Sequence, residues 1–167
     1  SDGFYEVAAL IENTHNFASA DRFFYRIKIY NQENILIGLR EGETFINPNE
    51  KFLILDPGLV TGERVPIRAL VEFDPIQWRY AEYSPPNAVV VSRYFSLEPQ
   101  PRLSAVLRNN DIFALDNLQV STILYDGAGK AIGVSISNVD KIEGRSERSV
   151  FFSWPKTALS QSPENIE

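Results

Sequence analysis

The stretch that decides the fold is QVSTILYDGAGKAIG, residues Gln119–Gly133. Apolar or small side chains alternate with others here at a period of two, which predicts a β-strand with one buried face. The positions expected on the buried face are Leu118, Val120, Thr122 and Leu124. Asp126–Gly129 then supplies a turn, because glycine accepts the positive φ angles of a tight hairpin. Lys130–Ser135 is the expected partner strand.

The same pattern occurs about 95 residues earlier, in FFYRIKIYNQENILIG, residues Phe23–Gly38. Its expected buried positions are Phe23, Tyr25, Ile27 and Ile29. Upstream, Val7–Asn13 resembles Leu103–Asn109, and downstream Val71–Phe73 resembles Phe152–Trp154. A repeat of this length indicates a duplicated domain, because solenoid units repeat every 20–50 residues or so.

We therefore expect an all-β protein of two tandem immunoglobulin-like β-sandwich domains. Short apolar runs separated by turn signals roughly every 8–12 residues favour this class. The first domain is expected over 1–83, with an insertion near 49–64 because its return to the last strand is longer. The second is expected over 84–158, followed by a flexible, polar tail at 159–167.

Several local features follow from turn-forming residues. Glu12–Arg22 is expected to be a loop in which Phe17 plugs the end of the sandwich. Turns are expected at Glu41-Gly42 and at Asp56-Pro57-Gly58.

Val150, Phe152 and Trp154 alternate and are expected to be buried together.

Composition limits the possible partners. The 167-residue chain has 16 Lys and Arg against 22 Asp and Glu, a net charge of −6, and its basic residues are scattered singly. This argues against a nucleic acid partner, which needs clustered cationic side chains. The chain has no cysteine, which excludes disulfides and thiolate chemistry. No segment approaches a membrane span or a secretory signal, so a membrane anchor is expected outside this chain.

Leu124-Tyr125-Asp126-Gly127, with Asn109 closing the preceding strand, resembles the bacterial FxLYD domains. The similarity covers about 88–154, and Thr122 stands where that family favours Phe. The phrase VAALIEN and the segment Phe151–Pro155 also look like parts of uncharacterised bacterial surface proteins with a membrane anchor. The resemblance implies an immunoglobulin-like or fibronectin-III-like fold on the extracytoplasmic side of the cell, and it implies no reaction.

Three polar groups are the candidates for a catalytic or metal site. His15 is the single histidine and would have to serve any Ser-His-Asp triad or zinc site, so we expect a solvated loop residue. The acidic pairs Glu41/Glu43 and Glu72/Asp74 are expected on a solvated face rather than in a glycosidase site. A loop cluster could hold calcium or could simply form turns; it comprises Asn109, Asn110, Asp111, Asp116 and Asn117, with Asp21 at the matching place in the first repeat. No catalytic, cofactor or metal residue is assigned.

Aromatic side chains offer the other candidates. Four are expected on outward faces, where they could bind sugar or protein or could cover strand edges and the domain boundary; these are Phe24, Tyr30, Tyr125 and Phe151. Trp78, Tyr80 and Tyr83 precede the boundary, and Pro85-Pro86 stiffens it because proline fixes φ. We expect a rigid junction with Trp78 or Tyr80 packed near it.

These features predict a non-enzymatic, monomeric, extracytoplasmic structural or interaction module without a cofactor. It would act as a spacer or present a binding surface to a protein or cell-envelope component. The alternative is a carbohydrate- or peptide-binding module that uses the outward aromatic residues.

Overall fold

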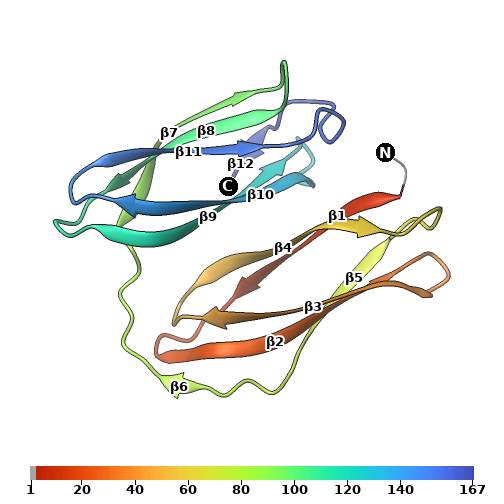
Figure 1. Cartoon of the computed structure of the whole chain (residues 1–167), viewed down its shortest axis with the longest axis horizontal. Coiled ribbons are helices and arrows are strands. Elements are labelled where there is room, and N and C mark those ends of the chain that lie inside the picture. The colour runs from red at the N-terminus through yellow and green to blue at the C-terminus, as the bar shows by residue number, and fades with distance from the viewer. Residues whose placement is uncertain (1–2) are drawn as a thin grey trace. The chain divides into compact units, whose positions relative to one another are not determined.

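The computed structural model describes residues 3–167, and in this range it is all-β, with antiparallel strands and no helix (Figure 1). The chain divides into two compact units, Ser1–Ser84 and Pro85–Glu167. Ser1 and Asp2, with which the expected first domain begins, lie outside the described residues. Each unit contains two small sheets, so the class predicted from sequence, all-β, is confirmed.

In the first unit one sheet pairs β1 (Phe4–Glu12) with β4 (Lys51–Val60). The other has the order β3-β2-β5, formed by β3 (Leu36–Ile46), β2 (Ala18–Tyr30) and β5 (Arg68–Phe73). A short strand, β6 (Arg79–Tyr80), pairs with the beginning of β2. Both sheets contribute to one core, because Val7 of β1, Ile54 and Leu59 of β4, and Ile27 and Ile29 of β2 form a single buried cluster.

The second unit is built in the same way. One sheet has the order β11-β8-β7, from β11 (Glu147–Ser153), β8 (Arg102–Asn109) and β7 (Ala88–Ser96). The other has the order β10-β9-β12, from β10 (Ala131–Ile142), β9 (Leu115–Tyr125) and β12 (Asn165–Ile166). The core again lies between the sheets: Leu103 of β8 and Leu124 of β9 are buried with Val150, Phe152 and Trp154. The predicted burial of the last three is confirmed.

The hairpin that decides the fold is made twice with the same hydrogen bonds. In the second unit Asp126 N donates to Lys130 O at 2.9 Å, and the Asp126 carboxylate accepts from the backbone N of Lys130 at 2.9 Å. In the first, Asn31 N donates to Ile35 O at 3.1 Å, and the Asn31 side-chain oxygen accepts from Ile35 N at 2.9 Å. An Asx side chain at this position therefore fixes both turns.

A β-bulge follows each turn at the same place. Ile29 pairs with Gly38 and Tyr30 with Leu36, just as Leu124 pairs with Gly133 and Tyr125 with Ala131. Both glycines are closely packed, because a Cβ on Gly133 would lie 3.2 Å from Trp154 Nε1 and one on Gly38 would lie 2.8 Å from Leu59 Cδ1. Leu59 thus occupies the place in the first unit that Trp154 occupies in the second.

The remaining strand pairings change the expected correspondence between the halves. Asn13 N donates to Glu50 O at 2.8 Å and Asn109 N to Ser146 O at 2.9 Å, so β4 is the counterpart of β11. Ile67 N and Glu164 N both donate at 2.9 Å, to Tyr30 O and Tyr125 O, so β5 is the counterpart of β12. The expected match of Val71–Phe73 to Phe152–Trp154, and with it the insertion near 49–64, is therefore wrong. The additional strand is β7, in the second unit.

The expected flexible tail at 159–167 is also wrong. Leu159 is 6% exposed and belongs to the core of the second unit. Asn165 and Ile166 pair with β9, and Glu167 exchanges two backbone hydrogen bonds of 2.9 Å with Ile123. Polar composition suggested disorder, but the backbone of this segment is satisfied by the edge of a sheet.

Three local expectations in the first unit also fail. The strand β2 begins at Ala18, inside the expected loop, and Phe17 is 50% exposed rather than plugging the core. Glu41 and Gly42 do not turn the chain, because they pair with Arg26 and Tyr25 in a continuous β3. Asp56–Gly58 likewise lies within β4, where the register shifts opposite β1.

The burial of Trp154 gives the first prediction. Its side chain is 2% exposed, and its Nε1 donates to Val134 O at 2.8 Å, which joins the end of β11 to β10. Trp154→Ala should lower the free energy of unfolding by about 3–5 kcal/mol, as large core truncations do, measured by chemical denaturation. Trp78→Ala, at a position that is 51% exposed, is the matched control and should change stability little. Equal effects of the two substitutions would contradict this assignment of the core.

Candidate binding surfaces

The most buried polar side chain of the second unit, Asn109, holds a loop in place. Its Nδ2 donates to Phe113 O at 2.8 Å and to Ile142 O and Glu143 O at 3.2 Å, while its Oδ1 accepts from Asp111 N at 2.9 Å. It is fully buried. Its side chain therefore joins the end of β8 to the loop that follows and to the end of β10.

Asn13 does the same in the first unit. Its Nδ2 donates to Ala18 O at 2.7 Å and to Asn47 O at 2.8 Å, and its Oδ1 accepts from His15 N at 3.1 Å. A backbone hydrogen bond also holds the loop after each asparagine: Asn49 N donates to His15 O at 2.9 Å, and Arg145 N donates to Asp111 O at 2.8 Å. We call this arrangement, centred on Asn13 or Asn109, the asparagine clamp.

The residues that could serve as calcium ligands each have other structural roles. Asn109 forms the clamp, and Asn117 adopts a left-handed backbone with φ of 55°. Asn110 Nδ2 donates to Asn87 Oδ1 at 3.4 Å, and Asp116 lies opposite Lys141 in the β9-β10 pairing. In the first unit Asp21 forms an ion pair with Arg79. Residues 3–167 contain no group of three or more His, Cys, Asp or Glu placed to hold a metal ion. These contacts support the alternative that the residues form turns.

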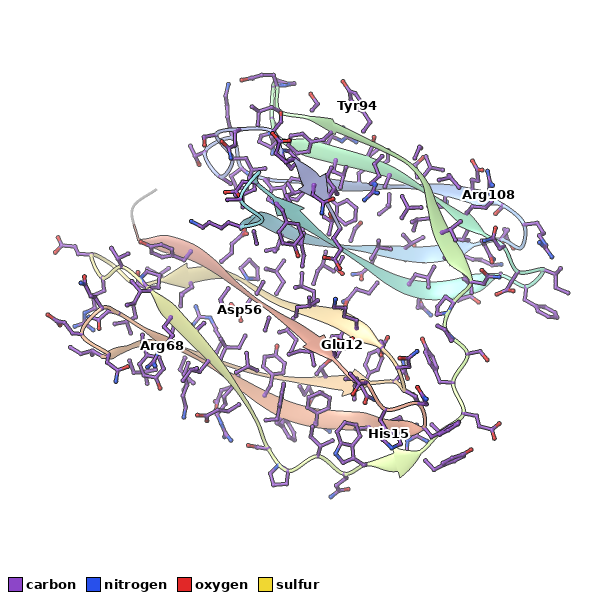
Figure 2. All side chains as sticks on the ribbon, turned by 180° about the vertical axis from the view of Figure 1, so that it is seen from behind. Glu12, His15, Asp56, Arg68, Tyr94 and Arg108 are labelled. Atoms are coloured by element: carbon purple, nitrogen blue, oxygen red, sulfur yellow. The ribbon has the colours of Figure 1, made fainter. Side chains whose placement is uncertain are left out.

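His15 lies in the loop after β1 (Figure 2) and is exposed. Its Nδ1 accepts a hydrogen bond from Phe17 N at 3.2 Å. Among the described hydrogen bonds and ion pairs, none joins this ring to a serine or a carboxylate, which fits the predicted loop histidine.

The acidic pairs form a ladder of cross-strand ion pairs on the outer face of β3-β2-β5. Glu43 pairs with Arg22, Asp74 with Arg26, and Glu72 with Lys28 at 2.8 Å. Glu41 lies opposite Arg26 in the β2-β3 register. Each carboxylate therefore has a basic neighbour on the adjacent strand, which suits a solvated face.

The four outward aromatic residues are covered individually, mostly by arginine. The guanidinium carbon lies 5.0 Å from the ring centre of Phe24 for Arg22, 4.8 Å from that of Tyr30 for Arg68, and 4.5 Å from that of Phe151 for Arg102. Tyr125 donates its hydroxyl hydrogen to Glu167 Oε2 at 3.1 Å, and burial followed by this carboxylate raises its pKa. In the second unit Tyr125 and Phe151 do not form one platform, because they belong to different sheets.

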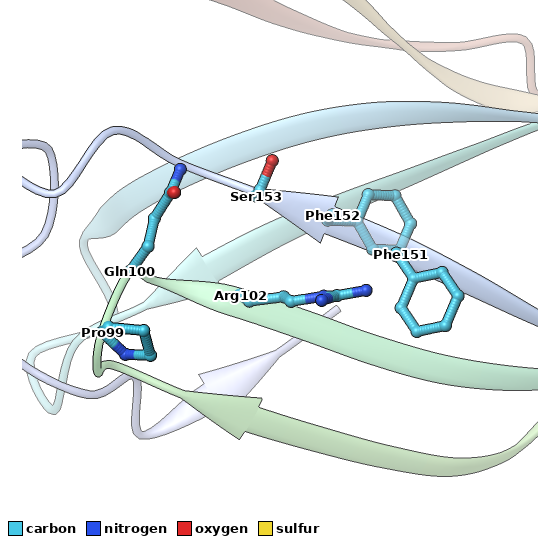
Figure 3. Close-up of a pocket in the computed structure, with 6 residues that line it drawn as sticks. All are labelled: Pro99, Gln100, Arg102, Phe151, Phe152 and Ser153. Carbon is cyan, nitrogen blue, oxygen red and sulfur yellow. The ribbon is translucent and has the colours of Figure 1, made fainter.

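Arg102 and Phe151 border an open hollow on the outside of β8 and β11 (Figure 3). Pro99, Gln100, Phe152 and Ser153 complete its lining. Gln100 Nε2 donates to Trp154 O at 2.9 Å, and Arg102 lies over the Phe151 ring, so these two of its three polar side chains already have structural partners. The third polar side chain of the lining is the short hydroxyl of Ser153.

An aromatic pair that the sequence did not reveal lies where β6 joins β2. The rings of Phe17 and Tyr80 stack with centroids 5.6 Å apart and planes 16° apart, although the residues are 50% and 69% exposed. Ala81 N donates to Phe17 O at 2.9 Å, and Tyr80 pairs with Ala18, which brings the two rings together. Trp78, beside β6, is also half exposed. The available signal was a single phenylalanine in a polar loop and three aromatic residues before a proline pair.

No protein-family model matches this chain, and no curated protein matches it. Within residues 3–167 the structure holds no helix of the length and apolar character needed to cross a membrane.

The asparagine clamp gives the second prediction. Asn109→Ala would leave three buried or partly buried carbonyl groups and the Asp111 amide without their partner. We expect a loss of about 2–4 kcal/mol in the free energy of unfolding, because unsatisfied buried groups keep their desolvation cost. Asn110→Ala is the neighbouring control and should cost well under half as much. Denaturant titration of both variants, with and without calcium, measures this; a loss at Asn109 that appears only with calcium would instead indicate a metal site.

Proposed function

We propose that this chain is a non-enzymatic, extracytoplasmic module of two tandem immunoglobulin-like sandwiches, which acts as a spacer or presents a protein-binding surface. Its partner would be a protein or another cell-envelope component, and the chain itself would be a monomer without a cofactor. The observation that carries the proposal is the repeated frame: hairpin, bulge and asparagine clamp recur in both units.

The proposed fold type rests on the position of the cores. In each unit, buried side chains of two antiparallel sheets share one cluster, as the inner faces of a β-sandwich do. Polar side chains at the ends of strands support that frame. Asn109 and Asn13 satisfy loop carbonyls, and Asp126 and Asn31 satisfy turn amides.

The proposed location rests on the resemblance to FxLYD domains. Its residues have structural roles that make sense of the motif: Leu124 is fully buried and Asp126 closes the hairpin turn. Such domains are extracytoplasmic in the family that the motif resembles. Protease treatment of intact cells that express the natural full-length protein tests the location, because an extracytoplasmic module would be cleaved without lysis.

The spacer role gives the third prediction. A spacer must keep its units at a fixed angle, and Pro85-Pro86 restricts the backbone between them. The chain has no cysteine, so Glu33→Cys and Ala128→Cys place one spin label on each unit, both at exposed positions. Double electron–electron resonance should then give a narrow distribution of distances between the two spin labels. Replacing both prolines with glycine is the control and should broaden it. A distribution that is already broad with the native prolines would refute the spacer role.

The second candidate, a carbohydrate- or peptide-binding module, is favoured by the exposed Phe17–Tyr80 pair. Exposed aromatic rings can bind apolar faces of ligands, and this pair carries no arginine over its rings among the described contacts. On a glycan array or peptide library, any ligand should be lost with Tyr80→Ala and retained with Phe24→Ala. Binding that survives Tyr80→Ala, or that fails for Phe24→Ala alone, would contradict this candidate.

A further inference from the structure

One edge of β1 has no strand partner among the described residues, whereas the same edge of its counterpart in the second unit, β8, is paired. β8 is paired on both sides, with β11 and with β7. β1 is paired with β4 alone among the strands of the described residues. Because β4 is the counterpart of β11, the unpaired edge of β1 corresponds to the edge of β8 that β7 covers.

The register of β7 defines which part of β1 is involved. β7 pairs with β8 from Ser96 opposite Arg102 to Ala88 opposite Asn109. The clamp asparagines and the sequences EVAALIEN and RLSAVLRN align Glu6–Asn13 with Arg102–Asn109. The second unit thus shows that the equivalent strand, β8, pairs with an antiparallel neighbour over its whole length.

The backbone groups on this edge alternate. Asn109 N donates toward β11, to Ser146, whereas Asn110 N donates toward β7, to Asn87, each at 2.9 Å. Asn13 N donates toward β4 in the same way as Asn109. Since successive residues of a strand point their amides to opposite edges, the even-numbered residues Ala8, Leu10 and Glu12 direct their amides and carbonyls to the unpaired edge.

The side chains of the same residues supply a chemical pattern. Glu6, Ala8, Leu10 and Glu12 are all exposed, Leu10 by 44%, and Glu12 is labelled in Figure 2. Two carboxylates therefore flank a small apolar centre. At the equivalent positions β8 carries Arg102 and Arg108, so the two strands have opposite charge. The first repeat, residues 1–83, is also the more acidic, with 13 Asp and Glu against 8 Lys and Arg.

We propose that the unpaired edge of β1 binds an extended peptide segment of a partner protein as an added antiparallel strand, with basic residues opposite Glu6 and Glu12 and apolar residues opposite Ala8 and Leu10. Main-chain hydrogen bonds supply the affinity in this mode, and alternate side chains supply the specificity. The inference deepens the proposed interaction function and rests on it.

A second copy of this chain fits the edge less well. If β1 paired antiparallel with itself about Ala9, Glu6 of each copy would lie opposite Glu12 of the other. Like charges directly opposite each other are destabilising in a sheet. The two carboxylates therefore disfavour self-association in the register that pairs residues 6–12 of the two copies, and they favour a basic partner.

The probe is the heptapeptide Lys-Thr-Val-Thr-Val-Thr-Lys with blocked ends, which places lysine, valine, valine and lysine opposite residues 12, 10, 8 and 6. Binding to the full chain is measured by titration with amide hydrogen exchange. We expect the amides of Ala8, Leu10 and Glu12 to exchange rapidly in the free protein and to become protected with peptide. The amides of Ala9 and Ile11, which face β4, should be protected in both states.

Charge reversal tests the specificity. Glu6→Lys with Glu12→Lys should weaken binding of the lysine peptide by about tenfold or more, since two attractive cross-strand pairs become repulsive. It should also confer binding of the peptide with glutamate at both ends. Glu33→Lys with Glu63→Lys changes net charge equally at exposed positions and is the matched control, which should retain its preference for lysine.

Backbone blocking tests the mode. Leu10→Pro removes an amide from the unpaired edge, where proline is tolerated, and should abolish binding, whereas Leu10→Thr should retain it. Thermal unfolding of each variant verifies folding. If Leu10→Pro does not fold, the charge-reversal pair still decides, because it leaves the backbone unchanged.

The inference is overturned if the three edge amides are already protected without peptide, if protection depends on protein concentration as in a dimer, or if the control pair alters binding as much as the edge pair. These outcomes leave the proposed module function standing. A broad spin-label distance distribution together with a cytoplasmic location would instead refute the module proposal, whatever the peptide does.

Discussion

The buried asparagine at the end of β8, and its counterpart at the end of β1, is the constraint on which each unit depends. A strand that leaves one sheet must cross to the other, and the crossing exposes backbone carbonyls near the core. Asn109 satisfies three of them with one amide group while its oxygen accepts from the following loop. Because a buried carbonyl without a partner is costly, the position of this side chain fixes the loop, and the loop fixes where β9 and β10 begin and end.

The hairpin and the core then follow from packing around that crossing. Asp126 and Asn31 start the turns, and the bulge after each turn places a glycine against the opposite sheet. Trp154 in one unit and Leu59 in the other fill the space that this glycine leaves. The pairing frame is therefore the same although the large core side chain differs.

Much of this could be predicted from the sequence because alternation and turn residues act locally. The strands at 23–30 and 118–125, the duplication, and the burial of Trp154 all follow from a period of two and from Asx-Gly or Asx turns. The correspondence of β4 with β11 could not be predicted, because it depends on which strand pairs with β1, and that pairing is non-local. Val71–Phe73 resembles Phe152–Trp154 in composition, so composition alone favours the wrong match. The order of residues 159–167 could not be predicted for a related reason: a polar segment is ordered when a neighbouring strand satisfies its backbone. At the surface, alternation in the sequence predicted which aromatic rings face outward. It did not predict the arginines that cover them, because those arginines come from other strand positions.

The divergence between the two units is concentrated at the edges of their sheets rather than in their frame. A duplicated fold inherits every constraint of its core, so clamp, turn and bulge cannot change independently. An edge strand carries no such constraint on its solvent side, and there the units differ: β8 is covered by β7, while β1 ends its sheet with acidic residues at both ends of an apolar centre. Charges on an edge can protect it against uncontrolled pairing, and the same charges select a partner of opposite sign. The side chains of Asn13, Asn109, Asn31 and Asp126 are engaged in the frame of their units, so the surfaces on which the two units differ are such edges and the exposed rings, and it is on these surfaces that the proposed binding role rests.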